Sequence, residues 1–152
     1  MRYHLVAIGN VKRKFYADGC AFYLERLKNY AKVDVLEIKE HKASQAETVK
    51  QIESEALLGA ASGFVIALDE TGKTFSSEKL SQRITTLENK SISSISILIG
   101  GAEGHSEHLK KTANELWSLS ALTLPHELAR LVLLEQLYRA ETIRAGHPYH
   151  RV

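Results

Sequence analysis

The sequence predicts one α/β domain with a mostly parallel sheet and helices on both faces of that sheet. Short apolar runs of strand length alternate along the chain with longer segments whose apolar residues recur at helical spacing. The length of 152 residues is about that of one ordinary domain, so we expect a single domain over residues 1–152. The 44% hydrophobic and 25% charged fractions exclude a disordered chain.

Four apolar segments are predicted to be strands. The third is apolar throughout, which is typical of a strand covered on both faces, and Asp69–Gly72 after it is predicted to be a turn. A short run over Ser118–Leu124 follows the fourth. The expected strands are Leu5–Gly9, Val33–Ile38, Phe64–Leu68 and Ile95–Ile99.

Five helices are expected between and after these strands. Ser44–Glu47 has the form of a capping box, and Ser76 or Ser77 can cap the third helix. Pro125 suits the first turn of the last helix, which Gly146 and Pro148 end. The expected helices are Ala17–Tyr30, Ser44–Ala61, 76–88, Ser106–Leu116 and the segment after Pro125.

Charge and cysteine content limit the function classes. Lys plus Arg is 20 and Asp plus Glu is 18, so the formal charge of +2 requires any nucleic-acid contact to come from a local patch. Cys20 is the one cysteine, which excludes an internal disulfide and fits a reducing compartment. No apolar stretch approaches the ~20 residues of a membrane span. We therefore expect a soluble cytoplasmic protein without membrane contact.

Ligands of such sheets bind beyond the carboxyl ends of the strands, which directs attention to Asp69–Lys73, Gly100–His105 and the turn at Pro125. Gly100–Gly104 matches neither the dinucleotide glycine pattern nor the Walker A loop. Its glycines have two interpretations. They either let the main chain come close to a ligand that carries no phosphate groups, or they form a tight strand-to-helix turn. The segment 117–126 is apolar and dotted with hydroxyls, so it fits a purine ring or, alternatively, an edge strand with half-buried serines.

Metal and nucleophile chemistry have weak support. His126–Arg130 nearly matches the zinc-protease pattern, but Arg130 stands where the second ligand belongs. His105 and His108 lack a partner at ligand spacing, and no serine lies in a nucleophile-elbow motif. We expect no metal site.

Cations and one aromatic residue crowd the carboxyl-terminal segment, a mixture that suits phosphate contact and base stacking. Lys12–Tyr16 repeats this mixture near the other end, and a solvated tail or loop is the alternative for each. The terminal residues concerned are Arg139, Arg144, His147, Tyr149, His150 and Arg151.

These motifs occur in one order and register, and with them the chain resembles the RlmH family of small SPOUT-class methyltransferases. The resemblance is dense from about Val65 onward and rests on Leu98–Gly104, Trp117–His126, Glu135–Ala140 and His147–Arg151. Ala102 stands where many relatives have Pro, and the loop Val11–Tyr16 is short.

The resemblance implies methyl transfer from S-adenosylmethionine to N3 of a pseudouridine in 23S rRNA of the assembled ribosome. It also implies a carboxyl-terminal trefoil knot and a homodimer. Two alternatives remain, a SPOUT methyltransferase with another RNA target and a non-catalytic ribosome-associated assembly factor. Cofactor contacts are expected at Leu68, Gly100, Leu119, Ser120, Ala121, Leu122, Thr123 and Leu124.

Roles for the terminal residues follow from the same chemistry. His150 is the candidate to accept the N3 proton or orient the base, because a free imidazole titrates at roughly 6.5. Tyr149 is expected to stack on the nucleobase, and Arg151 and Arg139 to hold phosphates. Arg144 and His147 are expected to contact the RNA as well.

Overall fold

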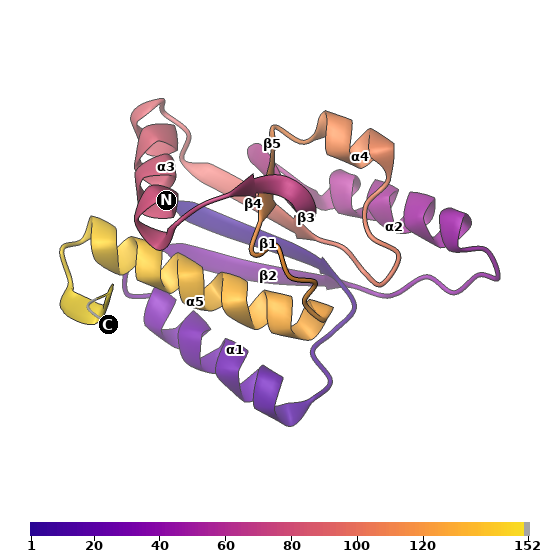
Figure 1. Cartoon of the computed structure of the whole chain (residues 1–152), viewed down its shortest axis with the longest axis horizontal. Helices are drawn as coiled ribbons and strands as arrows, with labels where there is room; N and C mark the ends of the chain where they lie inside the picture. The colour runs from indigo at the N-terminus through magenta and orange to yellow at the C-terminus, as the bar shows by residue number, and fades with distance from the viewer. Residues whose placement is uncertain (151–152) are drawn as a thin grey trace.

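The computed structural model describes residues 1–150, with Arg151 outside the described residues (Figure 1). Within them five parallel strands form one sheet in the order β2-β1-β4-β3-β5. The strands are β1 (Arg2–Ile8), β2 (Lys32–Ile38), β3 (Phe64–Thr74), β4 (Ser94–Ile99) and β5 (Glu115–Ser118). The helices are α1 (Lys14–Leu27), α2 (Ala46–Ala60), α3 (Ser77–Asn89), α4 (Glu107–Thr112), α5 (His126–Arg144) and the 3-10 turn η1 (Pro148–His150).

Helices cover both faces of the sheet, as predicted. Alternate residues of a strand point to opposite faces, so Leu5 of β1 joins the core beneath α1, α3 and α5, whereas Val6 joins the core beneath α2 and α4. The first core is the larger and includes Leu134 of α5. The second is closed by Leu57 of α2 and Leu109 of α4. The predicted α/β class is confirmed, while the trefoil knot stays a prediction.

Parallel strands give the sheet two chemically different ends. The loops after β3, β4 and β5 gather at the carboxyl end, where α5 begins at His126. From there α5 runs back along the sheet, and Figure 1 shows the described carboxyl-terminal end of the chain beside its amino terminus. Ion pairs of Glu88 with the Met1 ammonium (3.3 Å) and with Arg144 (2.8 Å) tie α5 and β1 together at this amino end.

Two predicted boundaries are wrong because neighbouring strands pair more extensively than the sequence pattern indicates. Asp69–Gly72, predicted to be a turn, is an irregular part of β3. Both Leu68 before it and Lys73 after it pair with Trp117 of β5, so the residues between them bulge out of the ladder. The helix predicted over Ser106–Leu116 ends at Thr112 and gives way to β5. Asn114 causes this change, because its backbone N–H donates to the Val65 carbonyl while its side-chain oxygen accepts from the Val65 N–H.

The helix ends test the capping predictions. Ser76 caps α3 and accepts from the Lys79 N–H at 3.2 Å, as predicted. The capping box at Ser44 is wrong, because α2 begins after Gln45, which makes no side-chain cap bond. Gly146 has φ +72° directly after the last helix, which agrees with the predicted stop.

The glycines of β3 and α2 give opposite predictions for stability. A Cβ at Gly72 would lie 2.6 Å from the Leu116 carbonyl carbon, so Gly72→Ala should lower the free energy of unfolding by about 1–3 kcal/mol. Gly59 lies in α2 with open space around a built Cβ, so Gly59→Ala should raise it by about 0.5–1 kcal/mol. Urea unfolding of both variants checks this, and equal shifts of the same sign would contradict it.

Candidate functional site

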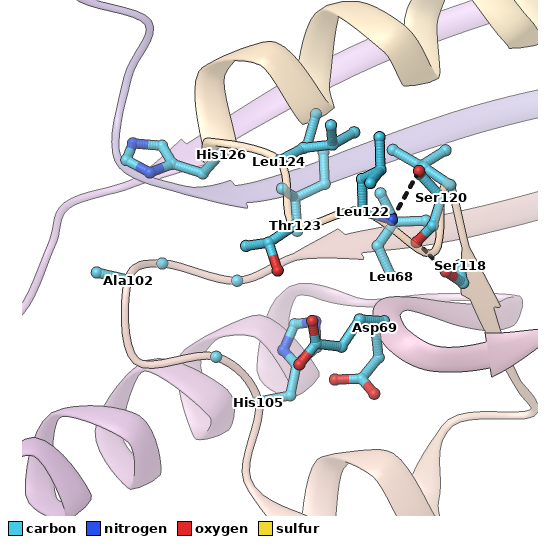
Figure 2. A pocket seen from close by; sticks show the side chains of 17 residues that line it. Leu68, Asp69, Ala102, His105, Ser118, Ser120, Leu122, Thr123, Leu124 and His126 are labelled. Atoms are coloured by element: carbon cyan, nitrogen blue, oxygen red, sulfur yellow. Dashed lines mark hydrogen bonds between the residues drawn. The ribbon is translucent and has the colours of Figure 1, made fainter.

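A cleft of about 280 Å³ lies at the carboxyl ends of β3, β4 and β5 (Figure 2). Three chain segments form it: the irregular part of β3, the glycine loop after β4 (residues 100–105), and the loop that joins β5 to α5 (residues 119–125). Most predicted cofactor residues meet here, while Ala121 does not line the cleft. The members of the predicted set that line it are Leu68, Gly100, Leu119, Ser120, Leu122, Thr123 and Leu124.

The glycine loop lies flat against the structure beneath it. A Cβ on Gly100 would lie 3.1 Å from the His105 ring, and one on Gly101 would lie 2.9 Å from a carboxylate oxygen of the buried Glu53. Since side chains have no room on the inner side, the loop presents main chain to the cleft. This agrees with bare backbone approaching a ligand, the first of the two interpretations of these glycines.

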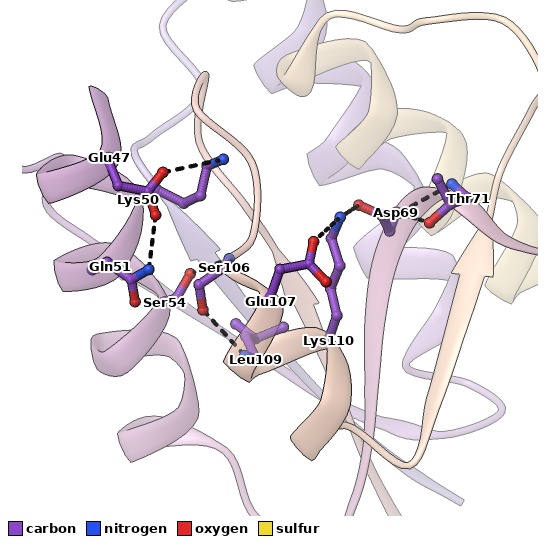
Figure 3. A network of polar contacts seen from close by, with 10 residues as sticks. All are labelled: Glu47, Lys50, Gln51, Ser54, Asp69, Thr71, Ser106, Glu107, Leu109 and Lys110. Carbon is purple, nitrogen blue, oxygen red and sulfur yellow. Dashed lines mark hydrogen bonds and ion pairs between the residues drawn. The ribbon is translucent and has the colours of Figure 1, made fainter. Parts of the chain in front are cut away.

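The far end of this loop is fixed by buried hydroxyls. Ser106 caps α4 by accepting from the Leu109 N–H at 3.1 Å, and its own N–H donates to the Ser54 hydroxyl of α2 at 2.8 Å (Figure 3). Both serines are almost fully buried, so these bonds are shielded from water. The loop is therefore anchored to α2 and α4.

Hydroxyls also shape the loop after β5. The Ser118 hydroxyl donates to the Ser120 carbonyl at 2.9 Å, and the Ser120 hydroxyl accepts from the Leu122 N–H at 2.9 Å. The Leu122 side chain is left 74% exposed beside the cleft. The hydroxyls that the sequence singled out thus hold the loop, and its leucines offer apolar surface.

The opposite wall of the cleft is acidic. Asp69 accepts bonds from the Thr71 N–H (3.0 Å) and hydroxyl and lies 3.5 Å from the Lys110 ammonium (Figure 3). Burial raises the pKa of Asp69, but the Thr71 bonds and the Lys110 charge outweigh it, so the pKa lies below its ordinary value. Glu70 also lines the cleft, while the Lys110 ammonium offsets part of the Asp69 charge.

The sequence interpretation placed His105 in a candidate ligand loop but left it out of the predicted cofactor contacts. Its side chain lies behind the glycine loop on the same wall as Asp69 (Figure 2) and is 4% exposed. Neither ring nitrogen has a hydrogen-bond partner among residues 1–150. Burial lowers the pKa of His105, against the Asp69 charge and the nearby Leu98 and Leu68 carbonyls, so the ring is neutral at pH 7.

The predicted catalytic and RNA-contacting residues lie elsewhere. α5 has 19 residues, so its ends are about 28 Å apart at 1.5 Å per residue. The cleft is at its first turn, whereas Arg144 and His147 are at or beyond its last turn, and Tyr149 folds back so that its hydroxyl donates to Glu135 at 3.2 Å, in the middle of the helix. Within the part of the chain that the structure describes, the two predicted sets are therefore not brought together.

The terminal cations are engaged within the chain. Arg144 pairs with Glu88 and Glu141, and these pairs outweigh burial and raise its pKa. Arg139 pairs with Glu135 at 2.6 Å and lies over the Tyr149 ring at 5.0 Å. Burial and hydrogen bonding raise the pKa of Tyr149, so its hydroxyl stays protonated at neutral pH.

The fold and the cleft define an α/β protein with a cleft walled by main-chain loops at the carboxyl end of a parallel sheet. Among residues 1–150 no cluster of three or more His, Cys, Asp or Glu could hold a metal ion. A family model described as "Predicted SPOUT methyltransferase" matches residues 1–150. The chain therefore belongs to the SPOUT methyltransferase family.

Individual relatives agree with this membership. A protein named Ribosomal RNA large subunit methyltransferase H from Deinococcus radiodurans is 45% identical, with 99% of each chain covered. One of the same name from Streptococcus suis is 42% identical, with 99% of this chain and all of the relative covered. A tRNA methyltransferase from Aquifex aeolicus has a similar fold (TM-score 0.55, 16% identity, 91% of this chain and 69% of that one).

The comparisons confirm the resemblance inferred from the motifs, and with it the class of enzyme and the methyl donor, S-adenosylmethionine. None of the helices in residues 1–150 is long and apolar enough to span a membrane.

His105 predicts a particular pH dependence of stability. Its pKa is lower in the folded chain than the ~6.5 of the unfolded chain, so below that value the unfolded chain binds more protons and folding weakens as pH falls. As pH falls, the free energy of unfolding of His105→Leu should decrease less steeply than that of the wild type, by up to about 1.4 kcal/mol per pH unit. Unfolding free energies from pH 7.5 to 5.5 measure it, with the exposed His108→Asn as control. Parallel profiles of wild type and His105→Leu would refute the prediction.

Proposed function

We propose that this single-domain, cytoplasmic enzyme (residues 1–152) methylates N3 of a pseudouridine in 23S rRNA of the assembled ribosome, with S-adenosylmethionine as donor. The observation that carries the proposal is the 45% identity, over 99% of both chains, to a protein named as a large-subunit ribosomal RNA methyltransferase. The position N3 and the pseudouridine come from the resemblance to the RlmH family.

The cleft fits the donor by the chemistry of its walls. The apolar side chains of Leu68, Leu122 and Leu124 suit an adenine ring, and the main chain of the glycine loop suits its polar atoms. Ionised Asp69 and neighbouring Glu70 suit a ligand that carries sulfonium and ammonium charges. His105 adds a buried polar side chain without a partner.

Methyl transfer in this proposal depends more on the alignment of donor and acceptor than on covalent catalysis. The sulfonium supplies a methyl group already activated for in-line displacement. The loops at the cleft fix the donor side, and proximity of the acceptor contributes several kcal/mol or more. On the acceptor side, Tyr149 stacks on the base, His150 takes or orients the N3 proton, and Arg151 contacts phosphate.

The separation along α5 supports a homodimer with shared active sites. The cleft lies at the first turn of α5, whereas the Tyr149 hydroxyl donates to Glu135, nine residues or about 14 Å further along the helix from His126, so the two do not adjoin within one chain. In a two-fold dimer whose subunits are antiparallel along α5, the terminal segment of one subunit meets the cleft of the other. Each active site then takes its donor from one chain and its acceptor contacts from the other.

The direct test uses labelled S-adenosylmethionine with ribosomes from a strain that lacks the gene. We expect label in 23S rRNA, with mass spectrometry of nucleosides finding one methylated pseudouridine, because each ribosome offers one acceptor in this proposal. Isolated large subunits and 16S rRNA are the matched controls. Label in another RNA would move the assignment to a second SPOUT target, and no label together with no heat of cofactor binding would refute methyl transfer.

Mixed dimers test the shared site. Thr123→Trp fills the cleft from an exposed position, and Tyr149→Ala with His150→Ala removes the acceptor contacts. Each variant alone should be inactive, while an equal mixture that exchanges subunits should regain roughly a quarter of wild-type activity, because half the dimers hold one complete site. Light scattering should give about twice 17.0 kDa. A fully active monomer, or a mixture without recovery despite exchange, would contradict the shared site.

A further inference from the structure

A second cleft, the amino-end cleft, lies at the opposite end of the sheet from the cofactor cleft. It encloses about 630 Å³ between the start of β1, the turn from α1 to β2 and the start of β4. Figure 1 shows this end of the molecule beside both described chain ends. Its charged lining side chains are Arg2, Lys28 and Lys32.

These cations are poorly neutralised. Within residues 1–150, the side chains of Arg2 and Lys32 make no ion pair or hydrogen bond, and all three cations are solvent-exposed. Lys28 has a partner only in Glu25, at 3.7 Å on the exposed surface, which is worth little. No carboxylate lines the cleft. The amino-end cleft therefore holds three positive charges in a chain whose formal charge is only +2.

The main chain around the cleft does not oppose an anion strongly. The negative end of the α1 dipole points here, but the Leu24 carbonyl accepts from the Lys28 N–H and the Leu27 carbonyl from the Tyr30 and Ala31 N–H groups. The Met1 ammonium also lies at the cleft and is paired with Glu88. A phosphate in the cleft would face ammonium and guanidinium groups.

The cleft is continuous with the segment assigned to the acceptor. Tyr30 lines it, and the Tyr30 ring meets the His147 ring edge-on at 6.3 Å between centroids. Cations beside aromatic rings suit single-stranded or looped RNA, whose phosphates bind the cations while its bases stack. By contrast, Arg139 and Arg144 already pair with carboxylates of their own chain, so the cations first expected to hold the RNA are engaged.

We propose that the amino-end cleft binds the sugar-phosphate backbone of the substrate RNA, with Arg2, Lys28 and Lys32 each contacting a phosphate. This inference rests on the proposed function and extends it to how the RNA is held. RNA bound in this cleft extends to the terminal segment of the same chain. In the proposed dimer, that segment completes the active site whose cofactor cleft belongs to the partner subunit.

The salt dependence of binding tests the proposal. Each phosphate contact contributes about 0.7 to the slope of log affinity against log salt for single strands, so three lost contacts reduce the slope by about two. Co-sedimentation with purified 70S ribosomes over a range of KCl measures it. Arg2→Ala, Lys28→Ala and Lys32→Ala combined should show this reduction and bind 10- to 100-fold more weakly in low salt.

Two control variants accompany this test. One measures the effect of overall charge, and the other measures the effect of changing the side chains of the cleft while keeping their charge. Lys42→Ala, Lys50→Ala and Lys111→Ala remove the same charge from outside the cleft and should keep the wild-type slope. Arg2→Lys, Lys28→Arg and Lys32→Arg keep the charges in place and should also keep it. Calorimetric affinity for S-adenosylmethionine should be unchanged in all three variants.

The outcomes distinguish this inference from the proposed function. If wild type labels 23S rRNA but the alanine variant of the cleft keeps the wild-type slope, the cleft inference is wrong and the function stands. If both alanine variants show the same reduction in the salt-dependence slope, overall charge explains the binding and the cleft inference is again wrong. If wild type labels no RNA, the proposed function fails, while a slope change confined to the cleft variant still supports RNA binding there.

Discussion

The common direction of the five strands is the constraint on which the rest of the structure depends. Because all pairings are parallel, every strand ends at the same end of the sheet, and the connecting loops there supply the main-chain walls of the carboxyl-end cleft. The last helix must then run back along the sheet, which carries the terminal segment away from that cleft. In the proposed enzyme, the separation of donor and acceptor contacts follows from this topology, and the proposed homodimer would bring them together.

Much of this arrangement could be predicted from the sequence, because buried parallel strands are continuous apolar runs and their alternation with amphipathic helices is easily recognised. The exceptions have tertiary causes. Residues 113–116 continue a helical pattern, but two hydrogen bonds between Asn114 and Val65 recruit the segment to the sheet. No local propensity encodes a partner almost fifty residues away. Likewise, periodicity alone suggests an open doubly wound sheet, and the knot was expected only from the resemblance to a family.

The candidate site also has features that the sequence predicts and features that only the folded structure reveals. The loops were predicted from their place after strands, whereas the individual glycine and leucine positions came from the family resemblance, and the structure gathers these positions around one cleft. The burial of His105 could not be inferred, because it depends on packing between segments distant in sequence, and only the folded structure leaves its ring buried and without a hydrogen-bond partner among residues 1–150. Its signal in the sequence was weak, a polar residue directly before the serine that caps α4.

The ion pairs near the carboxyl terminus change what the terminal residues do. Composition counts Arg139 and Arg144 as available cations, yet each is held by carboxylates of its own chain. Their pairs and the packing of Tyr149 against Tyr138 fix the start of the terminal segment to α5. A segment that leaves a rigid base loses less conformational freedom when it orders around RNA, so affinity gains from preorganisation. Arg139, which lies over the Tyr149 ring, then contributes by positioning Tyr149, and in the proposed RNA complex contact with phosphate falls to cations that the fold leaves unpaired.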